Sequence, residues 1–308
     1  MKISTIIGAV STALLMAASA DAYDFTPFDW STVKPGDTVS ISGKAILATE
    51  ADMPYVNSCK VALGGTGYLV ISNATTDCAL TFASGGSTGY LVKMGKSRQS
   101  FKNQLGGFYG AFVVEEGTAV CAGYYTFGNP QEAWSDHPNV YVRKGATAEI
   151  AFATEFYIRG FHIAGEGVDG KGAVILKTGD GLIQKLYLDD DAYIVSEVAG
   201  DFVQGRDKAS SGYSAKVNPG VLELNGHALT LGGSSTRIGL ANCEVTDSVG
   251  TGKIVYAAAT SGDRVVRFSG ANTVLSTPIV FEGNTTVQLY NSCAPIASPV
   301  TAKGSLTF

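Results

Sequence analysis

Charged side chains are scarce in this sequence. Asp, Glu, Lys and Arg together make up 16% of its 308 residues, whereas soluble domains average about 25%. The formal net charge is −5, and no stretch concentrates lysine or arginine. A nucleic-acid-binding protein needs a basic surface against the phosphates, so we expect no nucleic-acid partner.

Helical periodicity is equally rare. The clearest case is residues 97–107, SRQSFKNQLGG, where Phe101 and Leu105 share a helical face and Gly106 follows as a stop signal. We expect at most a short surface helix there and an otherwise β-rich chain. Glycine contributes 38 of the 308 residues, well above the usual share of about 7%, which is typical of a chain with many tight turns.

Long apolar runs are absent after the first two dozen residues, so we expect no transmembrane helix in the mature chain. The first 22 residues, MKISTIIGAVSTALLMAASADA, combine an early lysine, an apolar run over 6–18 and small residues at the end. This pattern is typical of a secretory signal peptide, with cleavage after Ala22 or after Ala20. We therefore expect an exported protein, located at the cell surface, outside the cell or in the periplasm.

Cysteines with the spacing of metal ligands are also missing. The chain has five cysteines, none in a CxxC pattern and none near a histidine: Cys59, Cys78, Cys121, Cys243 and Cys293. This argues against a structural zinc site. Because an oxidising exterior permits disulfides, Cys59 and Cys78 form a candidate disulfide, and the alternative is that the cysteines are small buried apolar residues.

What the sequence does contain is a recurring strand–turn–strand pattern. In 221–233, VLELNGHALTLGG, four leucines alternate with other residues on both sides of Asn225-Gly226. Five further segments follow the same pattern, at 39–48, 112–122, 140–150, 186–196 and 279–289. Alternation with period two across a short turn predicts paired short strands.

Units of this size cannot bury an apolar face alone, whereas stacking on their neighbours completes a core. We predict an all-β fold, a right-handed parallel β-helix or solenoid with irregular rungs, and a β-sandwich is the alternative. After the signal peptide (1–22), we expect a β-rich N-terminal part over 23–110, with capping as one role, and the solenoid over 111–308. The ending TAKGSLTF resembles the start of another rung, as in a solenoid truncated at its C-terminus.

Three motifs in a fixed order carry a family resemblance. They are FHIAGEGVDGKGAVI (161–175), LYLDDDAYIVSE (186–197) and LELNGHALTL (222–231). Within residues 157–233 the chain resembles secreted bacterial proteins with autotransporter-associated β-strand repeats. The resemblance implies a passenger-like β-helix at the bacterial surface, in a family that is mostly without an assigned enzymatic activity.

The best acidic cluster is Asp189, Asp190 and Asp191, which are the candidate ligands for Ca²⁺. Three consecutive acids at a turn point in different directions, so a solvated turn is the alternative. His162 and His227 lie within the family-like motifs. The sequence places no catalytic partner beside either histidine, which favours structural roles.

The densest aromatic stretch is Tyr124, Tyr125 and Phe127, with Trp134 nearby. These residues are the candidates for a glycan-binding surface, and packing over the solenoid is the alternative. GGSTG (85–89) matches the nucleophile-elbow pattern around Ser87. An elbow requires a following helix, whereas YLVKMG is strand-like, so we predict no nucleophile there.

Alignment of the repeated units places opposite charges at successive turns. Glu115-Glu116 is followed by Arg143-Lys144 and then by Asp189-Asp190. If these turns stack, they form a ladder of ion pairs that helps to fix the register.

These observations favour an exported surface or extracellular β-solenoid with an adhesive or structural, non-catalytic role. We expect no cofactor, and a surface component or glycan as partner. The alternatives are a carbohydrate-active β-helix, either a polysaccharide lyase or a glycoside hydrolase, and a glycan-binding module.

Overall fold

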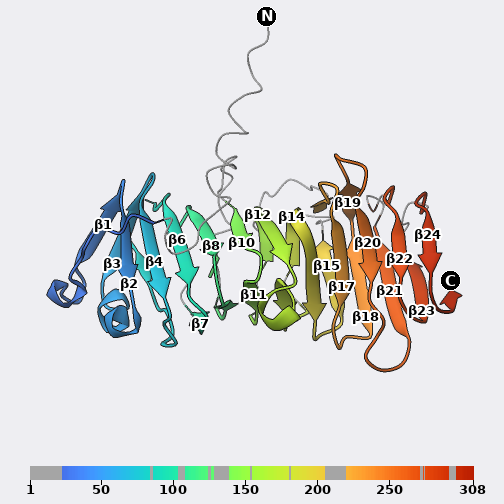
Figure 1. The fold of residues 1–308 in the computed structure, drawn as a ribbon, viewed down its shortest axis with the longest axis horizontal. Helices are drawn as coiled ribbons and strands as arrows, with labels where there is room; N and C mark the ends of the chain where they lie inside the picture. The colour runs from blue at the N-terminus through green and yellow to red at the C-terminus, as the bar shows by residue number, and fades with distance from the viewer. Residues whose placement is uncertain are drawn as a thin grey trace, which may run out of the picture.

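The computed structural model describes residues 23–83, 86–102, 108–123, 126–127, 139–152, 155–179, 182–204, 220–270, 273, 275–290 and 296–308. Their strands stack side by side along one long axis (Figure 1). Every pairing between these strands is parallel. The predicted β-solenoid is therefore confirmed, with about nine turns, and the antiparallel β-sandwich is wrong.

Three series of stacked strands build the main sheet. The first series is β2 (Ala45–Ala48), β4 (Tyr68–Ser72), β6 (Tyr90–Met94), β8 (Ala111–Val114), β10 (Val140–Val142), β12 (Glu155–Gly165), β14 (Leu182–Ser196), β16 (Gly220–Glu223) and β19 (Cys243–Thr246). The second series is β7 (Arg98–Phe101), β9 (Thr118–Cys121), β11 (Thr147–Ile150), β13 (Val174–Leu176), the later part of β14, β17 (Ala228–Gly232), β20 (Lys253–Tyr256), β22 (Ile279–Phe281) and β24 (Val300–Ala302).

The third series runs through the C-terminal half and consists of β15 (Gly200–Gln204), β18 (Arg237–Ala241), β21 (Arg264–Ser269), β23 (Thr285–Tyr290) and β25 (Leu306–Thr307). A separate sheet at the N-terminal end contains β1 (Thr38–Ser42), β3 (Lys60–Gly64) and β5 (Thr81–Phe82). Strand β6 pairs with β8 across residue 110. The first series is thus continuous through the position where we expect the N-terminal part to give way to the solenoid.

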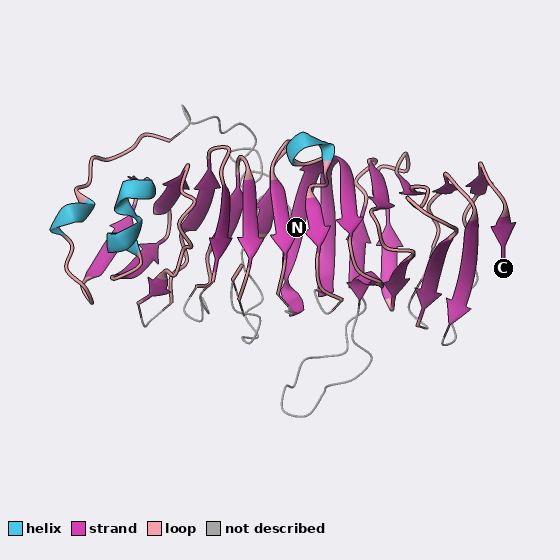
Figure 2. Ribbon diagram, turned by 90° about the horizontal axis from the view of Figure 1, so that it is seen from below, coloured by secondary structure: helices cyan, strands magenta, loops and turns pink. Residues whose placement is uncertain are grey.

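Short helices gather at the N-terminal end of the stack (Figure 2). They are η2 (Trp30–Thr32), η3 (Glu50–Asp52) and α2 (Met53–Val56), and η4 (Val168–Gly170) lies in a later turn. The buried Trp30 indole donates a hydrogen bond to Leu47 O at 2.9 Å, and Phe25 bridges to Ala45. These contacts cover the edge of β2, which would otherwise be open to another strand. No helix in the described parts of the chain has the length and apolarity to cross a bilayer.

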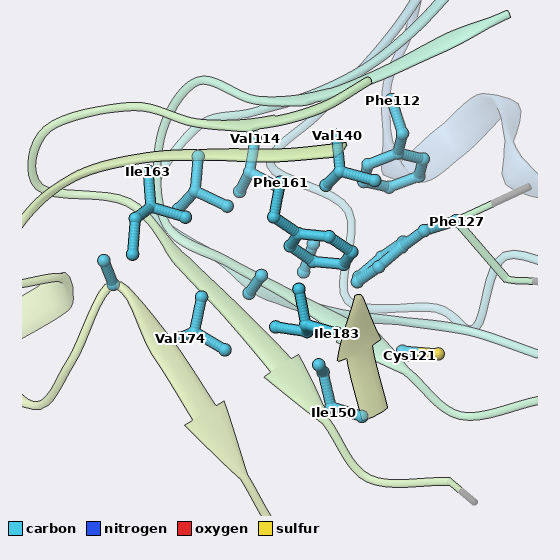
Figure 3. Packing of buried hydrophobic residues seen from close by; sticks show 14 of the residues in the cluster. Phe112, Val114, Cys121, Phe127, Val140, Ile150, Phe161, Ile163, Val174 and Ile183 are labelled. Atoms are coloured by element: carbon cyan, nitrogen blue, oxygen red, sulfur yellow. The ribbon is translucent and has the colours of Figure 1, made fainter. Parts of the chain in front are cut away.

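The core is a set of columns in which equivalent residues of successive turns lie above one another. The central column of the first series is Ile46, Leu69, Leu91, Phe112, Val140, Phe161, Leu186, Leu222 and Val245. All of these side chains are buried. Figure 3 shows Phe112 and Phe161 packing with Phe127 among aliphatic side chains from neighbouring turns.

The segment VLELNGHALTLGG occupies one such turn. All four of its leucines are fully buried: Leu222, Leu224, Leu229 and Leu231. Asn225 and Gly226 both have positive φ, 50° and 84°, which reverses the chain between β16 and β17. The alternation therefore identified the inward positions correctly.

The short helix considered for 97–107 is wrong over its described first part, because Arg98–Phe101 forms β7, and 103–107 lie outside the described residues. Gln99 and Phe101 alternate inward, and Phe101 is buried in the core. The amide of Gln99 donates to Thr76 O at 3.2 Å. Stacking on the preceding turn gives this polar side chain a partner, which local helical periodicity cannot reveal.

Two basic side chains point inward with carbonyl partners. Lys93 stands between Ile71 and Val114 in an apolar column, and its ammonium donates to Gly95 O and, at 2.8 Å, to Glu116 O. Burial lowers the pKa of Lys93 to about 8. Arg264 is also fully buried and donates to three carbonyl oxygens, those of Ser235, Gly233 and Ala258.

Candidate functional site

The polar residues singled out by the sequence lie mainly at one corner, where strands of the first series turn into strands of the second. Arg143 Nε lies 3.7 Å from Glu115 Oε1, and Lys144 Nζ lies 2.7 Å from Asp190 Oδ2. The predicted alternation of charge is confirmed for both pairs. The corner thus links turns that are far apart in sequence.

The Lys144–Asp190 pair spans two turns, because β12 lies between β10 and β14. Gly165 occupies the intervening turn with φ of 80°, and a Cβ there would stand 3.0 Å from Lys144 Cγ. Glycine therefore leaves room for the lysine to pass. The hydrogen bond between the two groups raises the pKa of Lys144 and lowers the pKa of Asp190.

Glu115 is more buried than Asp190, the other acid that is paired in the ladder, and desolvation raises the pKa of Glu115. The hydroxyl of Tyr23 donates to Glu115 Oε1 at 3.2 Å. The ring of Tyr23 also packs against Tyr68, with the centroids 5.5 Å apart. The first described residue of the chain is therefore held on the outer face of the first series.

Charge reversal at both basic positions, Arg143→Glu with Lys144→Glu, should lower the thermal midpoint by a few degrees at low salt. It replaces two attractive pairs with like charges, one of them against the poorly solvated Glu115. Differential scanning calorimetry at low and high salt measures the effect, which should shrink as salt screens the exposed pair. An unchanged midpoint at low salt would count against the ladder.

His162 has both ring nitrogens occupied. Asn139 Nδ2 lies 2.9 Å from Nε2, and the same amide accepts Gly160 N–H at Oδ1, which fixes the amide's orientation. Nε2 therefore accepts, and Nδ1 donates to Asp189 Oδ1 at 3.0 Å. The ring also stacks between Tyr141 and Tyr187, so the geometry matches the predicted structural role.

The turn after β16 is held by side chains from its neighbours. Asn225 Nδ2 donates to Leu188 O at 2.8 Å. Asp247 accepts the N–H groups of Gly226 and Gly252, both at 2.6 Å. Desolvation acts to raise the pKa of Asp247, but these backbone donors outweigh it and lower the pKa.

The three consecutive acids have separate partners. Asp189 faces His162, Asp190 pairs with Lys144, and Asp191 Oδ1 accepts Ala228 N–H at 2.8 Å. The structure does not gather them into one oxygen cage of the kind that Ca²⁺ needs. Instead, Asp190 and Asp191 come together with His227, and their ligand atoms all lie within 4.8 Å of one another.

The glycan-binding candidates divide into two groups. Tyr124, Tyr125 and Trp134 lie outside the described residues. Phe127 is fully buried, with its ring centroid 4.5 Å from that of Phe112. The assignment of Phe127 to a glycan-binding surface is therefore wrong, because a buried ring offers no face to a sugar.

The candidate disulfide between Cys59 and Cys78 is wrong, because both are buried free thiols, as the alternative interpretation has it. Cys78 bridges to Phe101 of the following turn. Desolvation raises the pKa of Cys59, and it raises the pKa of Cys78 to about 12. With Cys121 and Cys243 also buried and free, the four described cysteines behave as small apolar residues.

Ser87 is buried, and its hydroxyl accepts a hydrogen bond from Leu63 N–H at 3.0 Å. It donates to Val61 O at 3.4 Å. The hydroxyl thus ties the segment after β5 to β3 of the small N-terminal sheet. This agrees with the prediction that the GGSTG segment is no nucleophile elbow.

Sequence reasoning missed a row of aromatic side chains on the outer face of the first series. Tyr68 stacks on Tyr90 with centroids 4.5 Å apart, and Tyr141, His162 and Tyr187 form a second stack. The sequence did carry a signal for the second stack. Tyr141, His162 and Tyr187 are the middle residues of VYV, FHI and LYL, which occupy equivalent positions in successive turns. Their ring faces cover one another, so the stacks mainly support register.

Comparison of the chain with family models, with curated proteins and with solved structures finds no match. The architecture therefore rests on the strand pairing described above.

Proposed function

We propose that the chain is an exported β-solenoid of the bacterial surface or exterior, with an adhesive or structural role and no catalytic activity. Residues 1–22 support export through their signal-peptide pattern. The motifs over 157–233 support a role like that of autotransporter-associated repeat proteins. A stack of parallel turns presents extended surfaces of the kind that repeat proteins use for binding.

The observation that carries the non-catalytic part of the proposal is the set of partners that His162 and Lys144 have at the corner. His162 bonds to Asn139 and Asp189, and Lys144 bonds to Asp190. Each of these contacts joins one turn to another. A general acid or base needs a position open to substrate, whereas both nitrogens of His162 are already engaged.

A panel of acidic and neutral polysaccharides tests this proposal. The processed chain, purified from the exported fraction, is incubated with each glycan, and reducing ends and unsaturated ends are measured. We expect no release above a heat-inactivated control, with retention on a subset of surface glycans or on intact bacterial cells. Sustained release of either type of end would establish the carbohydrate-active alternative and overturn the proposal.

A further inference from the structure

His227 differs from His162 in what surrounds its ring. Among the described residues, no hydrogen bond reaches either nitrogen of the His227 imidazole, and its side chain is 34% exposed. The ring stands in the turn between β16 and β17, directly above the acidic turn of β14, since Asp191 accepts Ala228 N–H. An imidazole lone pair is thus left beside two carboxylates.

The distances fit shared ligation better than a hydrogen bond. His227 Nδ1 lies 3.7 Å from Asp191 Oδ1, too far for a hydrogen bond. Two ligands at about 2.1 Å from one tetrahedral ion stand about 3.4 Å apart. Asp190 completes a group whose ligand atoms all fall within 4.8 Å of one another. Two ligands at about 2.1 Å from one ion can be at most about 4.2 Å apart, so the side chains must rotate toward one another before all three bind the ion. Asp190 Oδ1 and Asp191 Oδ1 each accept one backbone N–H, and the second oxygen of each carboxylate is the one to turn toward the ion.

The donor set selects the class of ion. One imidazole nitrogen with two carboxylate oxygens suits Zn²⁺ and similar transition metals, whereas Ca²⁺ prefers six to eight oxygen ligands. Lys144 competes for Asp190, but its side chain is 75% exposed and can move into solvent. The ammonium therefore acts as a displaceable counter-ion at the same carboxylate.

We propose that Asp190, Asp191 and His227 bind a divalent transition metal ion of the Zn²⁺ class, which displaces Lys144 from Asp190. The ion joins the turn of β14 to the turn that precedes β17, and so adds a cross-link between successive turns of the solenoid. Its remaining coordination positions face solvent, where water or an external ligand binds. This site goes beyond the proposed function and does not depend on it.

Titration of the purified full chain with Zn²⁺ against a chromophoric chelator tests the site. We expect one site, and a rise in thermal midpoint on binding, since an ion that binds only the folded state stabilises it. His227→Ala should weaken binding by at least about tenfold, because loss of a residue that merely supports a ligand already costs about 10- to 100-fold. The His227 ring makes no hydrogen bond to a described residue, so this variant should fold with an unchanged metal-free midpoint.

Lys144→Gln provides the opposite test, since removal of the competing ammonium should strengthen Zn²⁺ binding several-fold. Lys171→Gln is its matched control: it removes the same charge from a lysine that pairs with Asp169, outside the group. The control should leave affinity unchanged. The proposal is overturned if the chain shows no saturable Zn²⁺ binding, if His227→Ala binds as tightly as the original chain, or if the two lysine variants behave alike.

Discussion

Replacement of Gly110 by alanine is expected to lower the free energy of unfolding by about 2–4 kcal/mol. A Cβ at this position would stand 1.9 Å from Gly89 O and 2.6 Å from a ring carbon of Phe108. Gly89 O accepts Ala111 N–H at 3.0 Å, so the oxygen cannot retreat without weakening the bond between two turns. Urea denaturation followed by circular dichroism gives the change directly.

Gly200→Ala is the matched control for this substitution. At Gly200 the nearest atom to an added Cβ is Gly179 O at 3.6 Å, an ordinary contact. Its φ lies outside the left-handed range, so we expect a change of less than about 1 kcal/mol. Equal losses in the two variants would mean that the turns do not approach each other at Gly110 as described.

Replacement of Lys93 by methionine is expected to change how stability depends on pH. The unfolded lysine keeps its proton to about 10.5, whereas burial lowers the pKa of the folded group to about 8. Between these values the unfolded state holds more protons, so stability rises with pH. From pH 7.5 to 9.5, the original chain should gain about 2 kcal/mol relative to the methionine variant.

The comparison must be between the two proteins, because the thiols of the unfolded chain titrate in the same pH range. Desolvation raises the pKa values of Cys78, Cys121 and Cys243 in the fold, so the unfolded thiols ionise first and stability falls with pH. That contribution is common to both proteins and cancels in the difference. Parallel stability profiles for the two chains would show that Lys93 does not face the core.

The inward positions of the repeated units could be predicted from the sequence, because strand alternation depends on neighbouring residues alone. Leu222 and Leu224 illustrate this, since both are fully buried as expected. The ion pairs of the corner were also predictable once equivalent turns were aligned. Lys144 and Asp190, for example, occupy matching positions in the units at 140–150 and 186–196, although the structure places one further turn between them.

Features that depend on register between turns were not predictable. The group formed by Asp190, Asp191 and His227 requires the register of β14 against β17, and the preceding pair of β12 with β14 contains two register shifts. Alternation places Lys93 on the same face as the inward Leu91, but the sequence does not show the carbonyl oxygens of other turns that bind its ammonium. Cys59 and Cys78 are close in sequence, yet sequence proximity does not fix which side chains meet.

Export is the claim on which the proposed role depends, and the N-terminus of the accumulated protein tests it most directly. The full chain is expressed in a bacterial host and fractionated, and the N-terminal residue is determined by sequencing and intact mass. We expect a processed chain in the exported fraction that begins at Tyr23 or Asp21. A chain that retains residues 1–22 and accumulates in the cytoplasm would contradict that expectation.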